Sequence, residues 1–149
     1  MEDIPLTNAV LLSEDTYHIF VYGTLKPGER YYELMCAPYV LEKRVAIAPG
    51  RLYDLPLGYP AMTLEEGWVT GMRLSFVDWA VLTRLDEFED YYPNRPLEES
   101  EYQRVERTIF TPDQAPLGKA WVYVMQPLRV QSVGGVWLPN GCWSGSLLP

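Results

Sequence analysis

The stretch that decides the fold is residues 18–25, which read His-Ile-Phe-Val-Tyr-Gly-Thr-Leu. Its first five residues form an unbroken β-branched and aromatic run, which is typical of a buried central strand. Gly23 ends this run, and glycine permits close backbone approach and unusual dihedral angles. Successive amides in such a strand-to-turn corner can hold an oxyanion or a carboxylate. The stretch therefore predicts a central strand followed by either an anion-binding turn or a plain corner.

The rest of the chain is divided by 13 prolines and 11 glycines, which predicts short, strand-rich elements around that strand. Further strands are expected at residues 39–48 and 50–54, around Pro49-Gly50. Two hairpins are expected, one pairing 60–64 with 67–76 across Glu65-Glu66-Gly67 and one pairing 103–111 with 118–126. The remaining expectations are an arm at 1–16, a short helix at 29–36, and a loop from 127 onward held by Trp137 and Trp143.

One clear helix is expected at residues 78–89, with Asp78 as its N-cap, because a carboxylate there accepts from the free amides of the first turn. At 100° per residue, four apolar side chains fall within one arc of about 120° that faces the core. They are Val81, Leu82, Leu85 and Phe88. Glu89 falls inside the same arc. The acidic residues expected to point elsewhere are Asp86, Glu87 and Asp90.

Glu89 is the candidate for proton chemistry. A carboxylate on an apolar face is costly unless it is neutral, paired or hydrogen-bonded. Loss of solvent raises the pKa of such a group from its ordinary value, so that it can act as a general base and then as an acid near neutral pH. The alternative is that Glu89 forms a structural pair with a neighbouring tyrosine, Arg104 or Arg107.

Charge and length exclude several classes of protein. Twelve Lys and Arg against twenty Asp and Glu give a net charge of −8, which argues against nucleic-acid binding and against anionic membrane surfaces. No apolar run approaches the ~20 residues that cross a bilayer, and Met1-Glu2-Asp3 lacks the basic stretch of a signal peptide. We therefore expect a cytoplasmic protein with one domain, 1–149, comprising a core of 18–126 and a loop-rich tail of 127–149.

Metal and histidine-based nucleophile sites are not expected. Cys36 and Cys142 lack the spacing of a metal-binding pair, and the single histidine, His18, heads an apolar strand. No Gly-x-Ser-x-Gly turn occurs. If the protein is an enzyme, we expect carboxylates to carry its proton transfers without a metal or a cofactor.

Several short motifs occur in an order that resembles the gamma-glutamylcyclotransferase-like family, which includes AIG2-like and gamma-glutamylamine cyclotransferase types. They are Tyr22-Gly23-Thr24-Leu25, Gly50-Arg51-Leu52-Tyr53-Asp54, Gly58-Tyr59-Pro60-Ala61, Val69-x-Gly71, Leu85-Asp86-x-Phe88-Glu89 and Tyr102-x-Arg104. The resemblance covers residues 18–126. It implies an α+β fold built on a small mixed β-barrel with one or two short helices, and a cavity between the Tyr-Gly-Thr-Leu turn and a catalytic glutamate, which here matches Glu89.

The resemblance also implies a reaction. Family enzymes act on γ-glutamyl compounds, in which the substrate's α-amine attacks its own γ-carbonyl and releases 5-oxoproline and an amine without metal or cofactor. Glu89 would be the general acid/base. The residues expected to bind substrate are Tyr22, Gly23, Thr24, Leu25 and Tyr102. For Tyr102, which matches the family's second tyrosine, core packing is the alternative.

Two functions therefore stand side by side. The first is a cofactor-free cyclotransferase acting on a γ-glutamyl amine, amide or peptide. The second is a non-enzymatic binding module for a small carboxylated metabolite. Glu89 favours the first, because a binder of acidic ligands gains nothing from a buried carboxylate. The loop at 90–101 is either a lid or selectivity element or a solvated loop. The expected partner is a small-molecule substrate, while the leaving amine and the oligomeric state stay open.

Overall fold

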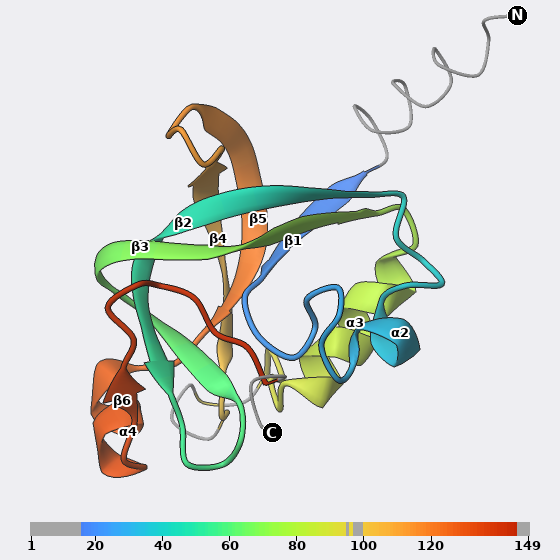
Figure 1. Ribbon diagram of the computed structural model, residues 1–149. Helices are drawn as coiled ribbons and strands as arrows, with labels where there is room; N and C mark the ends of the chain where they lie inside the picture. The colour runs from blue at the N-terminus through green and yellow to red at the C-terminus, as the bar shows by residue number, and fades with distance from the viewer. Residues whose placement is uncertain (1–15, 95, 97–99, 146–149) are drawn as a thin grey trace, which may run out of the picture.

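The structure is a computed structural model that describes residues 16–94, 96 and 100–145. The predicted arm, apart from Thr16, lies outside the described residues. Five strands close a mixed β-barrel (Figure 1). They are β1 (Tyr17–Val21), β2 (Glu42–Asp54), β3 (Pro60–Phe76), β4 (Gln103–Phe110) and β5 (Pro116–Val124). The strands follow the order β3-β1-β5-β4-β2, and pairing of β2 with β3 completes the barrel.

The central strand predicted from residues 18–22 is confirmed as β1. It lies antiparallel to β3, with Tyr17 opposite Phe76, and parallel to β5, with Ile19 opposite Trp121. Successive side chains of a strand point to opposite faces. Ile19 and Val21 accordingly join the core cluster that includes the side chains of α3, whereas Phe20 packs in a second cluster with β2 and β5 residues. Burial on both faces explains the unbroken apolar run.

The strands β2 and β3 form one long bent hairpin, which corrects two expectations. Residues 42–54 are a single strand rather than two, and β3 continues through Glu65-Glu66-Gly67 instead of turning there. The hairpin turn lies at residues 55–59. The register shifts after Pro49, where residues 64–67 of β3 lie opposite the single residue Gly50 of β2. A Cβ on Gly67 would lie only 2.8 Å from the carbonyl oxygen of Gly50, so glycine permits a sharp bend here.

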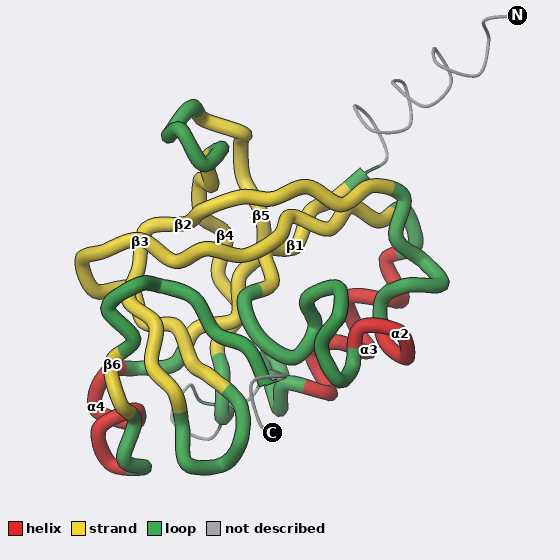
Figure 2. The backbone as a smooth tube through the Cα atoms, in the orientation of Figure 1, coloured by secondary structure: helices red, strands yellow, loops and turns green. Residues whose placement is uncertain are grey.

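Three helices occur among the described residues, one more than the upper expectation. They are α2 (Tyr32–Met35), α3 (Trp79–Phe88) and α4 (Pro127–Ser132). Figure 2 shows α2 and α3 together at one side of the barrel and α4 beside the short strand β6 (Val136–Trp137). The expectation of loop after residue 127 is therefore wrong. Pro127 suits the first turn of a helix, because the backbone N–H that proline lacks would have no hydrogen-bond partner within the helix there. Val130 of the same helix is buried.

The tail is held to the barrel, although Trp137 and Trp143 contribute differently. Trp143 is buried, and its Nε1 donates to Asp54 at 2.9 Å. Its carbonyl accepts from Lys26 Nζ at 2.5 Å, and the Gly145 amide donates to Glu29 at 3.1 Å. Trp137 pairs with Tyr53 across the β6–β2 register but is 53% exposed. Trp143 thus anchors the tail against the loop that follows β1.

The helix α3 confirms its predicted cap and most of its core face. Asp78 accepts from the Ala80 amide at 2.9 Å, and Val81, Leu82 and Leu85 are buried. Phe88 is instead 36% exposed. The expectation that Asp86 points away from the core is also wrong.

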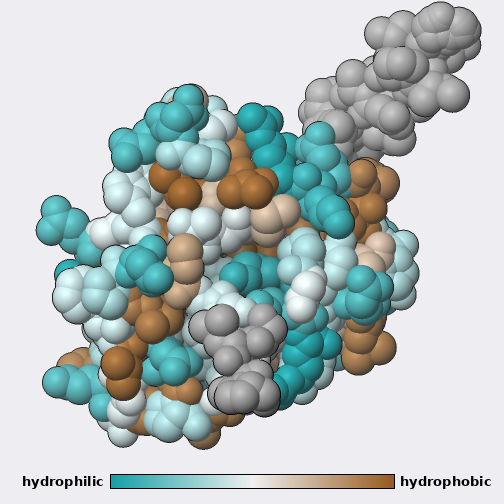
Figure 3. Space-filling view, viewed as in Figure 1, coloured by the Kyte–Doolittle hydropathy of each residue, from teal (hydrophilic) through white to brown (hydrophobic). Residues whose placement is uncertain are grey.

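The Asp86 carboxylate is buried because partners from two strands reach it. It accepts from the Tyr123 hydroxyl at 2.6 Å and lies 2.8 Å from Arg104 Nε. A buried charge is tolerated when it is paired and hydrogen-bonded. On the outer surface, hydrophilic and hydrophobic residues are intermixed on the face of Figure 3. No helix in the described part of the chain is long and apolar enough to span a membrane.

Candidate active site

A cavity of about 400 Å³ lies where the end of β1 meets the end of α3. It is also lined by the β2–β3 turn and by the residues that lead into β4. The structure brings all the residues predicted for the site to this one cavity. They are Tyr22, Gly23, Thr24, Leu25, Glu89 and Tyr102. Residues separated by up to eighty positions in the sequence therefore line one cavity.

The turn after β1 lines the cavity, and its backbone has free donors. Its carbonyls are occupied, since Gly23 accepts from the Lys26 amide at 3.0 Å and Thr24 from the Tyr31 amide at 2.9 Å. The amides of Gly23, Thr24 and Leu25 donate to no described residue. A Cβ on Gly23 would lie 2.7 Å from the ring of Pro60, so glycine lets the turn approach the facing wall. Three consecutive unpaired amides suit an anionic group.

The two tyrosines of the site line the cavity with their rings while their hydroxyls bond the backbone. The Tyr22 hydroxyl donates to the carbonyl of Tyr123 at 2.6 Å and accepts from the Met62 amide at 3.2 Å. The Tyr102 hydroxyl donates to the carbonyl of Pro60 at 2.6 Å. These bonds fix the shape of the wall, and they occupy the hydroxyl proton of each tyrosine.

Glu89 occupies the C-cap of α3, and its carboxylate makes no hydrogen bond or ion pair with the described residues. Burial raises the pKa of Glu89 to about 8, and the negative charges of Glu101 and Asp86 add to the effect. The alternative of a pair with Arg104 is wrong, because Arg104 pairs with Asp86. A carboxyl group with this pKa can exchange a proton with a ligand near neutral pH.

Sequence reasoning missed a second set of lining residues. Arg30 and Tyr31 lie on the β1 side, and Tyr31 packs edge-on against Phe88 with ring centroids 5.0 Å apart. Tyr59 and Glu101 also line the cavity, and the Tyr59 hydroxyl donates to the Glu101 carboxylate. Tyr59 belongs to the Gly58-Tyr59-Pro60-Ala61 motif, so the sequence does carry a signal for it. Glu101 lies in a loop without periodicity, and no local signal marks it.

The comparisons with known proteins identify the family. A family model described as Gamma-glutamyl cyclotransferase, AIG2-like matches residues 19–145. The chain belongs to this family. The match confirms the predicted resemblance to the gamma-glutamylcyclotransferase-like enzyme family.

Relatives with names or solved structures agree with this assignment. The Gamma-L-glutamyl-butirosin B gamma-glutamyl cyclotransferase of Niallia circulans is 34% identical over 109 residues, which cover 71% of this chain and 66% of that protein. An AIG2-like protein from Mus musculus has a crystal structure with a TM-score of 0.58 and 28% identity, covering 75% of this chain and 78% of the mouse chain. YkqA from Bacillus subtilis shares the fold, with a TM-score of 0.61 and 21% identity, over 86% of this chain and 39% of its own.

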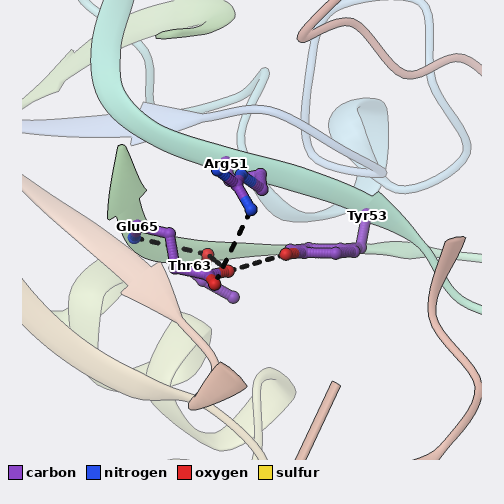
Figure 4. A network of polar contacts seen from close by, with 4 residues as sticks. All are labelled: Arg51, Tyr53, Thr63 and Glu65. Carbon is purple, nitrogen blue, oxygen red and sulfur yellow. Dashed lines mark hydrogen bonds and ion pairs between the residues drawn. The ribbon is translucent and has the colours of Figure 1, made fainter. Parts of the chain in front are cut away.

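In this family member, a polar network holds the hairpin that carries one cavity wall. Glu65 accepts from the hydroxyls of Tyr53 and Thr63, both at 2.7 Å, and lies 3.8 Å from Arg51 (Figure 4). The network ties β2 to β3 beyond the bend, next to the turn whose residues 57–60 line the cavity.

The loop at 90–101 contributes one described residue, Glu101, to the cavity of this family member. It starts with Asp90 at φ 58, a left-handed conformation that is uncommon outside glycine. The amide of Glu101 donates to the Asp90 carbonyl at 3.3 Å and to its carboxylate at 3.2 Å. Lid closure by the loop stays a prediction. Within the described residues, no cluster of three or more histidine, cysteine and acidic side chains could hold a metal ion.

Proposed function

We propose that the protein is a cofactor-free cyclotransferase that releases 5-oxoproline from a γ-glutamyl amine, amide or peptide by intramolecular aminolysis. The observation that carries the proposal is the unpartnered Glu89 carboxylate, with a pKa raised to about 8, in the same cavity as three free backbone amides. Membership of the family supplies the class of reaction. The chain spans 66% of its butirosin relative, so the substrate is not carried over from that protein.

In the proposed reaction, Glu89 moves one proton from the attacking nitrogen to the leaving nitrogen. The α-amine of the substrate attacks the γ-carbonyl carbon, and a carbon–nitrogen bond closes the five-membered ring. The ionised Glu89 accepts the proton that the attacking amine loses. It then returns this proton to the leaving nitrogen as the original amide bond breaks, which yields 5-oxoproline and a free amine. One carboxyl group completes the cycle, so no other acid is required.

The rest of the cavity would bind and orient the substrate. The amides of Gly23, Thr24 and Leu25, which bond no described residue, would donate to the substrate's carboxylate or to the oxygen that gains charge during the attack. The rings of Tyr22 and Tyr102 would hold the glutamyl chain in the folded conformer needed for ring closure. A volume of about 400 Å³ lies within the range of small-molecule sites, about 300–1,000 Å³.

The proposal is tested by following 5-oxoproline chromatographically. The substrates are γ-glutamyl amino acids, γ-glutamyl-ε-lysine, simple γ-glutamyl amines and glutathione, assayed with a chelator present. We expect release from at least one, and no release after acetylation of its α-amine, because the nucleophile is then lost. Release of glutamate would mean hydrolysis and contradict the proposal. Binding of 5-oxoproline without turnover of any substrate would favour the alternative, a binding module.

A further inference from the structure

Glu101 is a second carboxylate in the cavity, and the proposed chemistry does not use it. It is partly buried, and the Tyr59 hydroxyl donates to its Oε2. Its other oxygen, Oε1, accepts from no described residue. The described part of the chain gives it no ion pair. Arg129 acts on Tyr59 electrostatically, yet no ion pair joins Arg129 to Glu101. The carboxylate therefore retains a free acceptor and an uncompensated charge.

The position of Glu101 is fixed relative to Glu89. Its amide donates to both the carbonyl and the carboxylate of Asp90, the residue that follows Glu89. On the other side, Tyr59 holds the Glu101 carboxylate. A charged group held by backbone and side-chain bonds is preorganised, so little entropy is lost when it binds a partner. Glu101 is thus held in place like a ligand-binding residue, and not like a solvated loop residue.

We infer that Glu101, oriented by Tyr59, selects γ-glutamyl compounds whose leaving amine carries a further positive charge. The inference rests on the proposed function and specifies its substrate class. An ammonium group on the leaving amine would donate to Glu101 Oε1 in a charge-assisted hydrogen bond. A neutral leaving group would remove water from the carboxylate without replacing it, which costs binding energy.

The leaving amine fits Glu101 better than the substrate's own α-amine does. The α-amine must be a neutral nucleophile when it attacks, and an ionised carboxylate beside it would stabilise the unreactive ammonium form. The surroundings of Glu101 also favour the leaving group. Leu57 and Gly58, which line the cavity with Tyr59, are exposed, whereas Gly23 and Leu25 of the free-amide turn are buried. The glutamyl part would lie at the turn, and the leaving group would extend past Glu101.

The test compares matched γ-glutamyl amides. Those of diaminopropane and diaminopentane end in an ammonium group, while those of butylamine and hexylamine are neutral isosteres of the same length. We expect kcat/KM to be about ten- to a hundredfold higher for the ammonium compound of at least one pair, the range for a hydrogen bond to a charged group. Glu101→Gln should reduce this ratio towards one. Because the substitution also lowers the pKa of Glu89, any change in rate that all four compounds share is not counted, and the ratio within each pair is the readout. Equal kcat/KM within both pairs would overturn the inference and leave the proposed function standing.

Control variants separate selection from folding. Glu106→Gln removes an exposed charge on β4 outside the cavity and should leave the ratio unchanged. Tyr59→Phe keeps the Glu101 carboxylate but releases it, so the ratio should fall only in part. If Glu101→Gln slows all four compounds equally and leaves the ratio unchanged, Glu101 contacts the glutamyl part that they share, and the inference is overturned.

A binding measurement tests the inference even without turnover. In the Glu89→Gln variant, calorimetry should show a lower Kd for the ammonium amides than for their neutral isosteres, and adding Glu101→Gln should abolish the difference. That result, with no 5-oxoproline released by the wild-type protein, would support charge selection while contradicting the proposed reaction. Equal Kd values, or no binding of any compound, would overturn the inference.

Discussion

Glu65 and Glu89 are the same residue type in two regions of the molecule, and the protein treats them in opposite ways. Glu65, at the bend of the long hairpin, accepts hydrogen bonds from Tyr53 and Thr63 that hold its pKa below the usual range (Figure 4). Glu89, at the end of α3, has no partner among the described residues, and burial raises its pKa to about 8. Tyrosines lie near both carboxylates. The difference lies in where their hydroxyls donate.

Around Glu89 the nearby hydroxyls are used elsewhere. Tyr22 and Tyr102 donate to backbone carbonyls, and Tyr123 donates to Asp86. The donors that would satisfy Glu89 are therefore unavailable to it, and the carboxylate keeps its capacity to accept a proton. A satisfied carboxylate stabilises the fold, whereas an unsatisfied one costs stability and gains reactivity.

The largest effect should come from Glu89→Gln. It keeps the shape of the side chain but removes proton exchange, so we expect turnover to fall by about 10² to 10⁴, the usual contribution of a general acid/base. Glu65→Gln is the matched control, and its turnover should stay near that of the wild-type protein. The readout is 5-oxoproline release on a substrate found for the wild-type protein. Wild-type turnover by Glu89→Gln would remove Glu89 from the mechanism.

Asp86 sharpens the comparison, because it is buried like Glu89 and partnered like Glu65. Asp86→Ala leaves the Arg104 charge and the Tyr123 hydroxyl without their acceptor, so unfolding free energy should fall by about 3–5 kcal/mol. Tyr123→Phe removes only one hydrogen bond to the charge and should cost about 1.5–3 kcal/mol. Denaturant unfolding measures both. Equal losses would mean that the ion pair with Arg104 contributes nothing.

The pH dependence of stability should also separate the two glutamates. Between about pH 4.5 and 8 an unfolded chain has lost the Glu89 proton while the folded protein keeps it, so this group makes unfolding free energy fall as pH rises. Glu89→Gln should therefore gain stability over wild type across that interval, by at most about 1.4 kcal/mol per pH unit. Thermal unfolding at several pH values checks this. A difference that does not change with pH would contradict the raised pKa.

The smallest effect is expected for Glu65→Gln. Because the pKa of Glu65 is lowered in the folded protein, its contribution is present above the ordinary carboxyl pKa and is lost as pH falls through the lowered value. At pH 7 the substitution should cost about 0.5–1.5 kcal/mol, the net value of a typical hydrogen bond. The cost should disappear in acid. A cost that grows as pH falls would contradict the lowered pKa of Glu65.

The sequence predicted which residues line the cavity better than it predicted the long hairpin. The position of Glu89 in the cavity wall was predicted because α3 is regular as far as Phe88, so helical spacing holds up to the residue before Glu89. The same spacing misplaced Asp86, since its partners Arg104 and Tyr123 come from distant strands that a helical pattern does not include. Local periodicity reports the direction of a side chain relative to its own element, and not the partners that other elements supply.

The errors in the predicted strand boundaries arose at segments that contain glycine. Pro49-Gly50 and Glu65-Glu66-Gly67 mark a bend within paired strands, and the same residues are equally suited to a turn that separates strands. Only the long-range pairing of β2 with β3 distinguishes the two. Glu101 could not be found for a related reason. Its place in the cavity depends on bonds to Asp90 and Tyr59, which no local pattern encodes.

The anchoring of the tail has a consequence for how the protein is made. Lys26 bonds to Trp143, and Glu29 to Gly145, across 117 and 116 positions of the sequence. Contacts of such long range cost more loop-closure entropy than local ones, and they slow folding. During synthesis, several seconds separate the appearance of the Gly23 turn from that of its anchor. The barrel strand that carries the turn is thus synthesised before the loop that completes the turn's support.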